Sequence, residues 1–219
     1  MIENIIFDFD GVLVDSEILA GRAFVKYLKS HNMLFSEQEF ATHYAGNKTI
    51  DIVSKLSLKY NINNKKFFFE SVMDIANNMF HNELTTTPGI INFLKDIKQN
   101  KFIGSNSPKQ RIVEGLKQTK LNKYFDIQKI FSFDEVEKPK PAPDVYLKAL
   151  KVCNIKSNNT VVIEDSVVGT QAGVAANLKV IGLTSGGHWY KRSPESLINA
   201  GPIAVASNCN DIINIIRNL

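Results

Sequence analysis

The sequence predicts an α/β protein, built as a doubly wound and mostly parallel sheet with an all-helical unit inserted after the first strand. Short apolar runs alternate with amphipathic stretches along most of the chain, and that alternation indicates βαβ crossovers. The first apolar run is nearly continuous, as in strands that are covered on both faces. A stretch rich in Lys and Asn, without a convincing buried strand, follows it and predicts the helical insert.

Composition limits the classes of function. The 219 residues are 44% hydrophobic and 22% charged, which is typical of a soluble globular protein with a sizeable core. The formal charge of +4 favours anionic ligands. The sequence has no block of basic residues of the kind that would indicate nucleic-acid binding. No apolar run reaches membrane-spanning length, and acidic residues at Glu3 and Asp8 argue against a signal peptide. We therefore expect a cytoplasmic protein.

The first strand is expected at residues 2–7, followed by a helix that Ser16 caps and that runs to about His31. Two further amphipathic helices are expected around residues 50–58 and 67–80. Residues 15–85 would then form the helical unit, inserted into an α/β domain made of residues 1–14 and 86–219.

The rest of the chain alternates strands with helices. The expected strands are 101–104, 127–133, 160–163, 180–183 and 203–206. The expected helices are 88–97, one that contains Ile112, Val113 and Leu116, 144–153, 171–177, and a C-terminal helix through Ile216.

Polar residues close three of these strands: Asp8 and Asp10, Ser105 and Asn106, and Glu164 and Asp165. In a doubly wound sheet, ligands bind at the carboxyl ends of the strands. We therefore expect these six side chains to converge on one edge of the sheet.

Asp8 and Asp10 are the most informative of these residues. Two carboxylates one residue apart, at the end of a buried strand, repel each other and lose hydration unless a cation or proton compensates them. A divalent metal is the simplest compensation, and Gly11 allows the backbone to turn. Taken alone, the stretch fits equally well an ordinary strand that runs into an acidic turn.

Four motifs occur in order along the chain. They are Asp8-Phe9-Asp10-Gly11-Val12, Ser105 after an apolar strand, Lys140 before Pro141-Ala142-Pro143-Asp144, and Glu164-Asp165 after an apolar strand. Together they resemble the motifs of the haloacid dehalogenase (HAD) superfamily of phosphohydrolases, in the branch with a helical cap inserted after the first motif. The resemblance spans nearly the whole chain.

The resemblance implies a role for each motif. Asp8 matches the nucleophile, which forms an aspartyl-phosphate, and Asp10 matches the general acid and base. Mg²⁺ would be held by Asp8, by the main-chain carbonyl of Asp10 and by Asp165. Glu164 would add a direct or an indirect contact to the metal.

The remaining motif residues would bind the phosphate. Ser105 and Asn106 would contact its oxygens, and Lys140 would supply fixed positive charge. Lys138 competes for that role, but Lys140 directly precedes Pro-Ala-Pro-Asp. Each motif alone also has a structural explanation, such as a turn with an N-cap or an acidic helix start.

The family pattern implies a Mg²⁺-dependent phosphatase that acts on a small phosphorylated metabolite, such as a sugar or sugar-acid phosphate. The cap would exclude water, and Lys48 in its loop is a candidate substrate contact. A phosphosugar mutase of the β-phosphoglucomutase type shares all four motifs, and a response-regulator receiver module is a remote alternative. We expect a monomer or weak homodimer, without nucleic acid or membrane partners.

Overall fold

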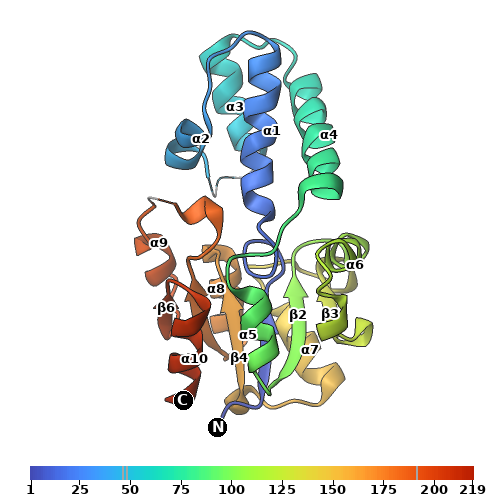
Figure 1. The fold of residues 1–219 in the computed structure, drawn as a ribbon, viewed down its shortest axis with the longest axis vertical. Coiled ribbons are helices and arrows are strands. Elements are labelled where there is room, and N and C mark those ends of the chain that lie inside the picture. Colours follow the sequence, from blue (N-terminus) through green and yellow to red (C-terminus); the bar gives the residue numbers. More distant parts are fainter. Residues whose placement is uncertain (46, 48, 191) are drawn as a thin grey trace.

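The computed structural model describes residues 1–45, 47, 49–190 and 192–219, and its centre is a parallel sheet of six strands (Figure 1). The strands lie in the order β3-β2-β1-β4-β5-β6, and every pairing is parallel. Their bounds are β1 Asn4–Phe7, β2 Asn100–Ser105, β3 Ile130–Ser132, β4 Thr160–Glu164, β5 Lys179–Leu183 and β6 Ala204–Ala206. The predicted α/β class is confirmed.

Helices cover both faces of the sheet because its side chains alternate between the faces. In β1, Ile5 and Phe7 belong to one apolar cluster and Ile6 to the other. The first cluster includes residues of α5 (Ile90–Asp96), α6 (Lys109–Gln118) and α10 (Cys209–Arg217). The second includes residues of α7 (Asp144–Cys153) and α8 (Val167–Ala175).

Short elements complete this part of the chain. They are α9 (Glu195–Ile198) and the 3-10 turns η1 (Asn122–Tyr124), η2 (Ile127–Lys129), η3 (Phe133–Glu135), η4 (Ser157–Asn159) and η5 (Gly187–Trp189).

Two sequence-based boundaries need correction. Residues 127–129, predicted as the start of a strand, form the turn η2, and β3 occupies only Ile130–Ser132. The Asp126 side chain accepts a hydrogen bond from the Gln128 N–H at 3.0 Å and stabilises that turn. Helix α8 begins four residues earlier than expected, at Val167, because Ser166 caps it by accepting from the Gly169 N–H.

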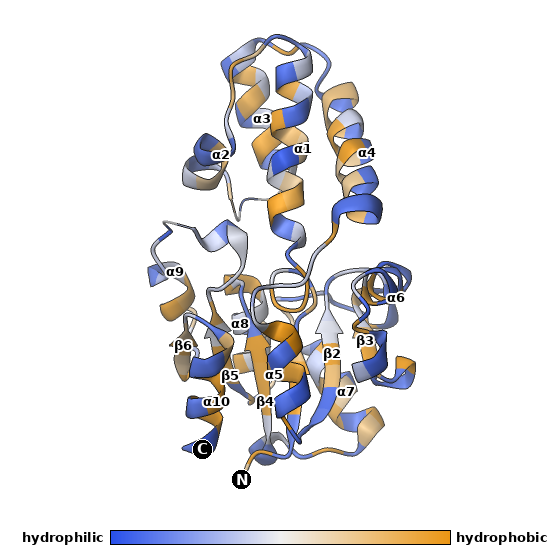
Figure 2. Cartoon of the chain, in the orientation of Figure 1, coloured by the Kyte–Doolittle hydropathy of each residue, from blue (hydrophilic) through white to orange (hydrophobic). Residues whose placement is uncertain are grey.

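Four helices form a separate layer above the carboxyl ends of the strands (Figure 1). They are α1 (Ser16–Ser30), α2 (Glu37–His43), α3 (Thr49–Tyr60) and α4 (Lys65–Glu83). Aromatic rings hold the layer together: Phe24 of α1 stacks on Phe40 of α2 and meets Phe68 of α4 edge to face. Figure 2 shows hydrophobic and hydrophilic segments alternating along these helices, as expected for one-sided burial.

Helix α2 was not among the predicted elements. Its N-cap is Ser36, whose hydroxyl accepts a hydrogen bond from the Glu39 N–H at 3.1 Å. Ser followed three residues later by Glu is a start signal that could have indicated this helix.

The helical layer joins the sheet through two adjacent segments. Val14 bridges Thr86, and the Asp15 N–H donates to the Thr85 carbonyl at 3.0 Å. The cap predicted at Ser16 is wrong, because Ser16 is already the first helical residue and Asp15 precedes it. The Ser16 hydroxyl is instead directed toward Asp10.

Strand β1 lies between β2 and β4, where the direction of strand succession reverses. Phe7 is level with both Ile103 and Ile163, so the residues that follow the three strands emerge together. A crevice for ligands forms at such a reversal point in a doubly wound sheet.

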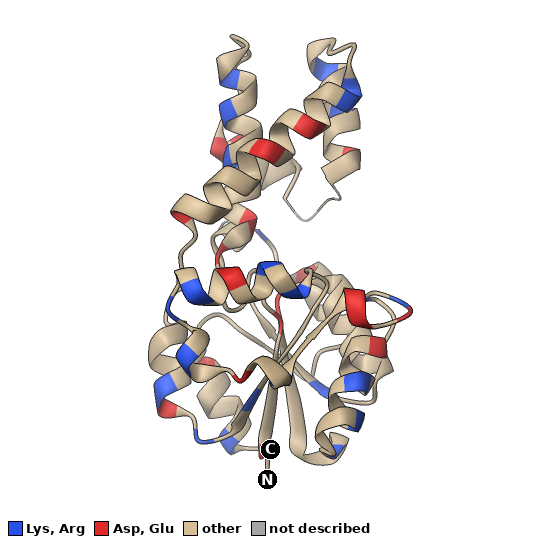
Figure 3. Ribbon diagram, turned by 90° about the vertical axis from the view of Figure 1, so that its right-hand side faces the viewer, with Lys and Arg blue, Asp and Glu red and all other residues tan. Residues whose placement is uncertain are grey.

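Charged residues are mixed on the surface. Figure 3 shows Lys and Arg interspersed with Asp and Glu over the helices on that side of the molecule. Among the residues that the structure describes, no helix has both the length and the apolar character that crossing a bilayer requires.

Candidate active site

A cavity of about 460 Å³ lies between the carboxyl ends of the strands and the helical layer. Its walls bring together all the predicted site residues except one: Asp8, Asp10, Ser105, Asn106, Lys140, Glu164 and Asp165. Lys48 lies outside the described residues. The convergence predicted from the strand ends is therefore present in the structure.

Lys140 connects two carboxylates at the floor of the cavity. Its Nζ donates to Asp8 Oδ1 at 2.7 Å and to Glu164 Oε1 at 2.6 Å. The Lys140 side chain is 3% exposed and that of Glu164 is 0% exposed. Burial alone would lower the pKa of Lys140, but the two carboxylates hold it well above its ordinary value. Lys138 is exposed.

Both oxygens of Glu164 are already engaged by the protein. Oε1 accepts from Lys140 and from the Tyr146 hydroxyl at 3.0 Å. Oε2 accepts from the Asp165 N–H, the Ser166 N–H and the Ser166 hydroxyl at 3.0–3.1 Å. Glu164 thus fixes Lys140 on one side and the turn after β4 on the other.

Two glycines make room for these acids. A Cβ on Gly169 would lie 1.6 Å from Glu164 Oε1, and a Cβ on Gly11 would lie 1.9 Å from Asp165 Oδ2. Gly11 also has φ +79°, a backbone conformation that glycine adopts without strain. Any side chain at either position would displace a carboxylate of the site.

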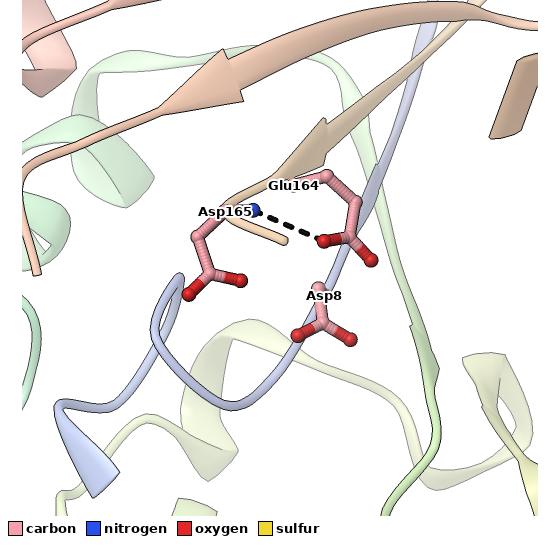
Figure 4. A group of neighbouring side chains, drawn as sticks. All are labelled: Asp8, Glu164 and Asp165. Carbon is pink, nitrogen blue, oxygen red and sulfur yellow. Dashed lines mark hydrogen bonds between the residues drawn. The ribbon is translucent and has the colours of Figure 1, made fainter. Parts of the chain in front are cut away.

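Asp8, Glu164 and Asp165 form a buried cluster in which one ligand oxygen from each lies within 4.8 Å of the others (Figure 4). Burial, followed by the Glu164 charge, raises the pKa of Asp165, and burial raises that of Asp8 against the opposing effect of Lys140. When all three carboxyl groups are ionised, the single ammonium group of Lys140 leaves two of their negative charges uncompensated. Oxygen ligands with this charge suit a divalent cation.

Asp10 is held by two hydroxyl groups. Ser16 of α1 donates to Asp10 Oδ1, and Ser107 donates to Oδ2. Neither serine was predicted to contact the site. The two bonds fix the orientation of a carboxyl group that lines the cavity.

Ser105 and Asn106 follow β2. The Ser105 hydroxyl is buried and accepts from the Ser107 N–H at 3.0 Å. The Asn106 side chain bonds the main chain of Lys140 twice, accepting from its N–H at 2.9 Å and donating to its carbonyl at 3.2 Å. Asn106 therefore holds Lys140 in place across the cavity.

His188, in the loop after β5, borders the cluster. Its Nε2 lies 3.0 Å from Asp165 Oδ2, and burial lowers its pKa. The loop is tied to the helical layer because Asp15 accepts from the Gly187 N–H at 3.0 Å. His188 is buried, and its Nδ1 has no hydrogen-bond partner among the described residues.

Glu17 of α1 lines the cavity opposite the strand ends. Burial raises its pKa to about 7, the negative charges of Asp165 and Asp10 add to this, and His188 and Arg111 oppose it. No hydrogen bond to another described residue occupies its carboxyl group.

Sequence reasoning missed several residues that shape the site, namely Ser16, Glu17, Ser107, Tyr146, Gly169 and His188. Ser107 stands two residues after Ser105 and could have been recognised as part of the same loop. Tyr146 and Gly169 act on Glu164 from within helices, and the sequence carries no signal for that.

The model of the family described as haloacid dehalogenase-like hydrolases matches residues 5–183. The chain is 29% identical to 6-phosphogluconate phosphatase of Escherichia coli over 82% of this chain and 81% of that protein. It is 26% identical to a phosphorylated carbohydrates phosphatase of Thermotoga maritima over 99% of each chain.

A solved structure is similar throughout. A haloacid dehalogenase-like protein of unknown function from Agrobacterium tumefaciens matches with a TM-score of 0.90 and 28% identity. The match covers 100% of this chain and 99% of that one. The helical layer and the sheet thus occur together in a related protein.

Replacing Lys140 with Met removes the cation between two buried carboxylates. Breaking a buried ion pair on one side costs about 3–5 kcal/mol, so we expect the Tm in chelator to fall by roughly 10 °C. Calorimetry measures the change, and Lys138→Met, at an exposed position, is the control. Equal Tm values for the two variants would contradict the structural importance of the Lys140 contacts.

Replacing Glu17 with Gln tests the raised pKa of this carboxyl group. A carboxyl that binds its proton more tightly in the folded state makes stability fall as pH rises, here between about 4.5 and 7. Without metal, Glu17→Gln should therefore raise the free energy of unfolding by about 1–3 kcal/mol at pH 8 and leave it unchanged at pH 4. Urea denaturation at both pH values is the measurement, with Glu83→Gln as an exposed control; a pH-independent difference would refute the assignment.

Proposed function

The chain belongs to the haloacid dehalogenase-like hydrolase family, and we propose that it hydrolyses a small phosphorylated carbohydrate with Asp8 as nucleophile and Mg²⁺ as cofactor. It is a phosphoric monoester hydrolase, as its family and its phosphatase relatives indicate. The observation that carries the proposal is the contact of Lys140 with Asp8 inside the buried acidic cluster. Family membership also removes the receiver-module alternative.

Asp8 begins the reaction. One of its carboxylate oxygens attacks phosphorus, the bond from phosphorus to the sugar oxygen breaks, and an aspartyl-phosphate forms. Water then attacks phosphorus, releases inorganic phosphate and regenerates the carboxylate. Lys140 fixes the orientation of Asp8 through its 2.7 Å hydrogen bond. Its positive charge favours the ionised carboxylate and so opposes the burial that raises the pKa of Asp8.

Asp10 carries the proton. It donates to the departing sugar oxygen in the first step and accepts a proton from the attacking water in the second. Ser16 and Ser107 hold the carboxyl group in place for both steps. General acid–base catalysis of this kind contributes about 10²–10⁴-fold to the rate.

The buried cluster fits Mg²⁺. We propose that Asp8, Asp165 and the main-chain carbonyl of Asp10 hold the ion, since both oxygens of Glu164 already accept from protein donors. Glu164 then acts indirectly, by placing Lys140 and Asp165. The ion would offset the repulsion between the Asp8 carboxylate and an anionic phosphate.

The phosphate oxygens need further donors. We propose that the Ser105 hydroxyl, adjacent main-chain N–H groups and Lys140 supply them. Asn106 contributes by holding the main chain of Lys140. Fixed donors of this kind stabilise the negative charge on the equatorial oxygens during transfer.

The helical layer would act as a cap. In this proposal residues 15–85 close over a core formed by residues 1–14 and 86–219, and closure excludes bulk water. Lys48 stays a proposed substrate contact. A cavity of about 460 Å³ beneath a closed cap would admit a small metabolite and exclude a macromolecule.

The substrate class follows from the relatives. One acts on 6-phosphogluconate and another on phosphorylated carbohydrates, according to their names. We propose that this chain also takes a sugar or sugar-acid phosphate. A screen of such compounds, scored for free phosphate and for isomerised ester, separates hydrolysis from mutase activity.

Asp8→Asn should abolish turnover because the amide cannot form the aspartyl-phosphate. The rate of phosphate release from p-nitrophenyl phosphate and from sugar phosphates measures the loss. We expect kcat to fall by more than about 10³-fold, as it does when other enzymes lose their nucleophile. Circular dichroism checks that the variant is folded. Retained activity would reject Asp8 as nucleophile.

Removing divalent metal with a chelator should stop the reaction, and added Mg²⁺ should restore it. Mg²⁺ at about 100 times its Kd should also stabilise the folded protein by about 2.7 kcal/mol, measurable as a higher Tm. Asp165→Asn should lose both effects. If the rate and Tm are insensitive to chelator and to Mg²⁺, the acidic cluster is not the metal site.

A further inference from the structure

Two arginines line the active-site cavity, and neither forms an ion pair with a carboxylate of the residues that the structure describes. They are Arg111, in the first turn of α6, and Arg192, after η5. The motifs and the reaction described above assign no role to either residue.

Each guanidinium group lies over an aromatic ring. The Arg111 Cζ is 3.7 Å from the centroid of Phe80, and the Arg192 Cζ is 4.7 Å from that of Trp189. Both rings are buried. Stacking fixes the plane of a guanidinium group and leaves the N–H groups at its edge for an acceptor.

The two stacking rings lie on segments joined to the helical layer. Trp189 belongs to η5, whose Gly187 N–H donates to Asp15, the residue before α1. Phe80 belongs to α4 of the helical layer, which is above the carboxyl ends of the strands (Figure 1). Asp8 and Glu164 lie at the strand ends themselves. A substrate whose phosphate meets Asp8 and whose other end points into the cavity toward the helical layer would reach the arginines, which line the same cavity.

We propose that Arg111 and Arg192 form a second anion subsite, which selects phosphate esters that carry a carboxylate at the end remote from the phosphate. This inference rests on the proposed function and narrows it to sugar-acid phosphates over neutral sugar phosphates. A guanidinium group presents paired N–H donors that match the two oxygens of a carboxylate.

The remaining cavity wall is consistent with a sugar acid. Glu17, the acidic side chain of this wall, has a carboxyl group without a protein hydrogen bond in the described structure and can accept from sugar hydroxyls. Among Glu17, Arg111 and Arg192, the two guanidinium groups outnumber the one carboxyl group. A volume of about 460 Å³ is within the range of small-ligand sites.

The test compares two probes that differ at one end, 6-phosphogluconate and glucitol 6-phosphate, which carries a hydroxymethyl group in place of the carboxylate. For the unaltered enzyme, we expect kcat/KM to favour 6-phosphogluconate by about 10–100-fold. Arg111→Met should reduce this ratio at least tenfold, mainly through KM. Arg111→Lys should retain part of the preference for 6-phosphogluconate. Arg217→Met, at an exposed position of α10, is the control and should leave the preference unchanged.

Binding separates this inference from the proposed function. Titration calorimetry with Asp8→Asn and Mg²⁺ measures the Kd of both probes without turnover. Asp8→Asn should bind 6-phosphogluconate more tightly than glucitol 6-phosphate. Adding Arg111→Met to this variant should remove the preference. An enzyme that hydrolyses neither probe nor p-nitrophenyl phosphate contradicts the proposed function, while the Kd values still decide the subsite.

Two results would overturn the subsite. One is an unaltered enzyme whose kcat/KM values for 6-phosphogluconate and glucitol 6-phosphate differ by less than twofold. The other is an equal loss for both probes in Arg111→Met, which would mean that Arg111 acts on the transferred phosphate or on folding. Because Arg111 packs on Phe80, the Tm of each variant is measured too. If Arg111→Met does not fold, Arg192→Met applies the same criterion.

Discussion

The site depends on one buried ammonium group. Lys140 joins Asp8, at the end of β1, to Glu164, at the end of β4, and these adjacent strands flank the reversal point of the sheet. Taking three charged groups out of water is costly unless each is closely paired. The donors around Glu164 and the hold of Asn106 on Lys140 provide that pairing. Together they keep Asp8 in place beside the proposed metal position.

Much of this arrangement could be predicted from the sequence because parallel strands place their carboxyl ends at one edge. That rule was sufficient to bring Asp8, Ser105 and Asp165 together. The preference for Lys140 over Lys138 came from the resemblance to the family pattern, in which the lysine directly precedes the Pro-rich segment. The supporting residues were beyond such rules. Tyr146 and Gly169 reach Glu164 through tertiary packing alone, and nothing in their local sequence differs from an ordinary helix.

Local misassignments have a similar cause. Residues 127–133 have the apolar character of a strand, but Ile127 is 57% exposed and Asp126 caps a 3-10 turn there. Ser16 has the residue type of an N-cap, yet its hydroxyl bonds Asp10 and Asp15 precedes the helix. In both cases a side-chain hydrogen bond affects the local structure, and the pattern of apolar and polar residues does not reveal such a bond.

The bond between Ser16 and Asp10 joins the two layers of the molecule. Ser16 is the first residue of α1, which belongs to the helical layer, whereas Asp10 follows the central strand of the sheet. Asp15 makes a second such link to the loop after β5. A rotation of α1 relative to the sheet would therefore alter the hydrogen bonding of Asp10 directly, so the position of the helical layer and the orientation of the proposed proton carrier are mechanically coupled.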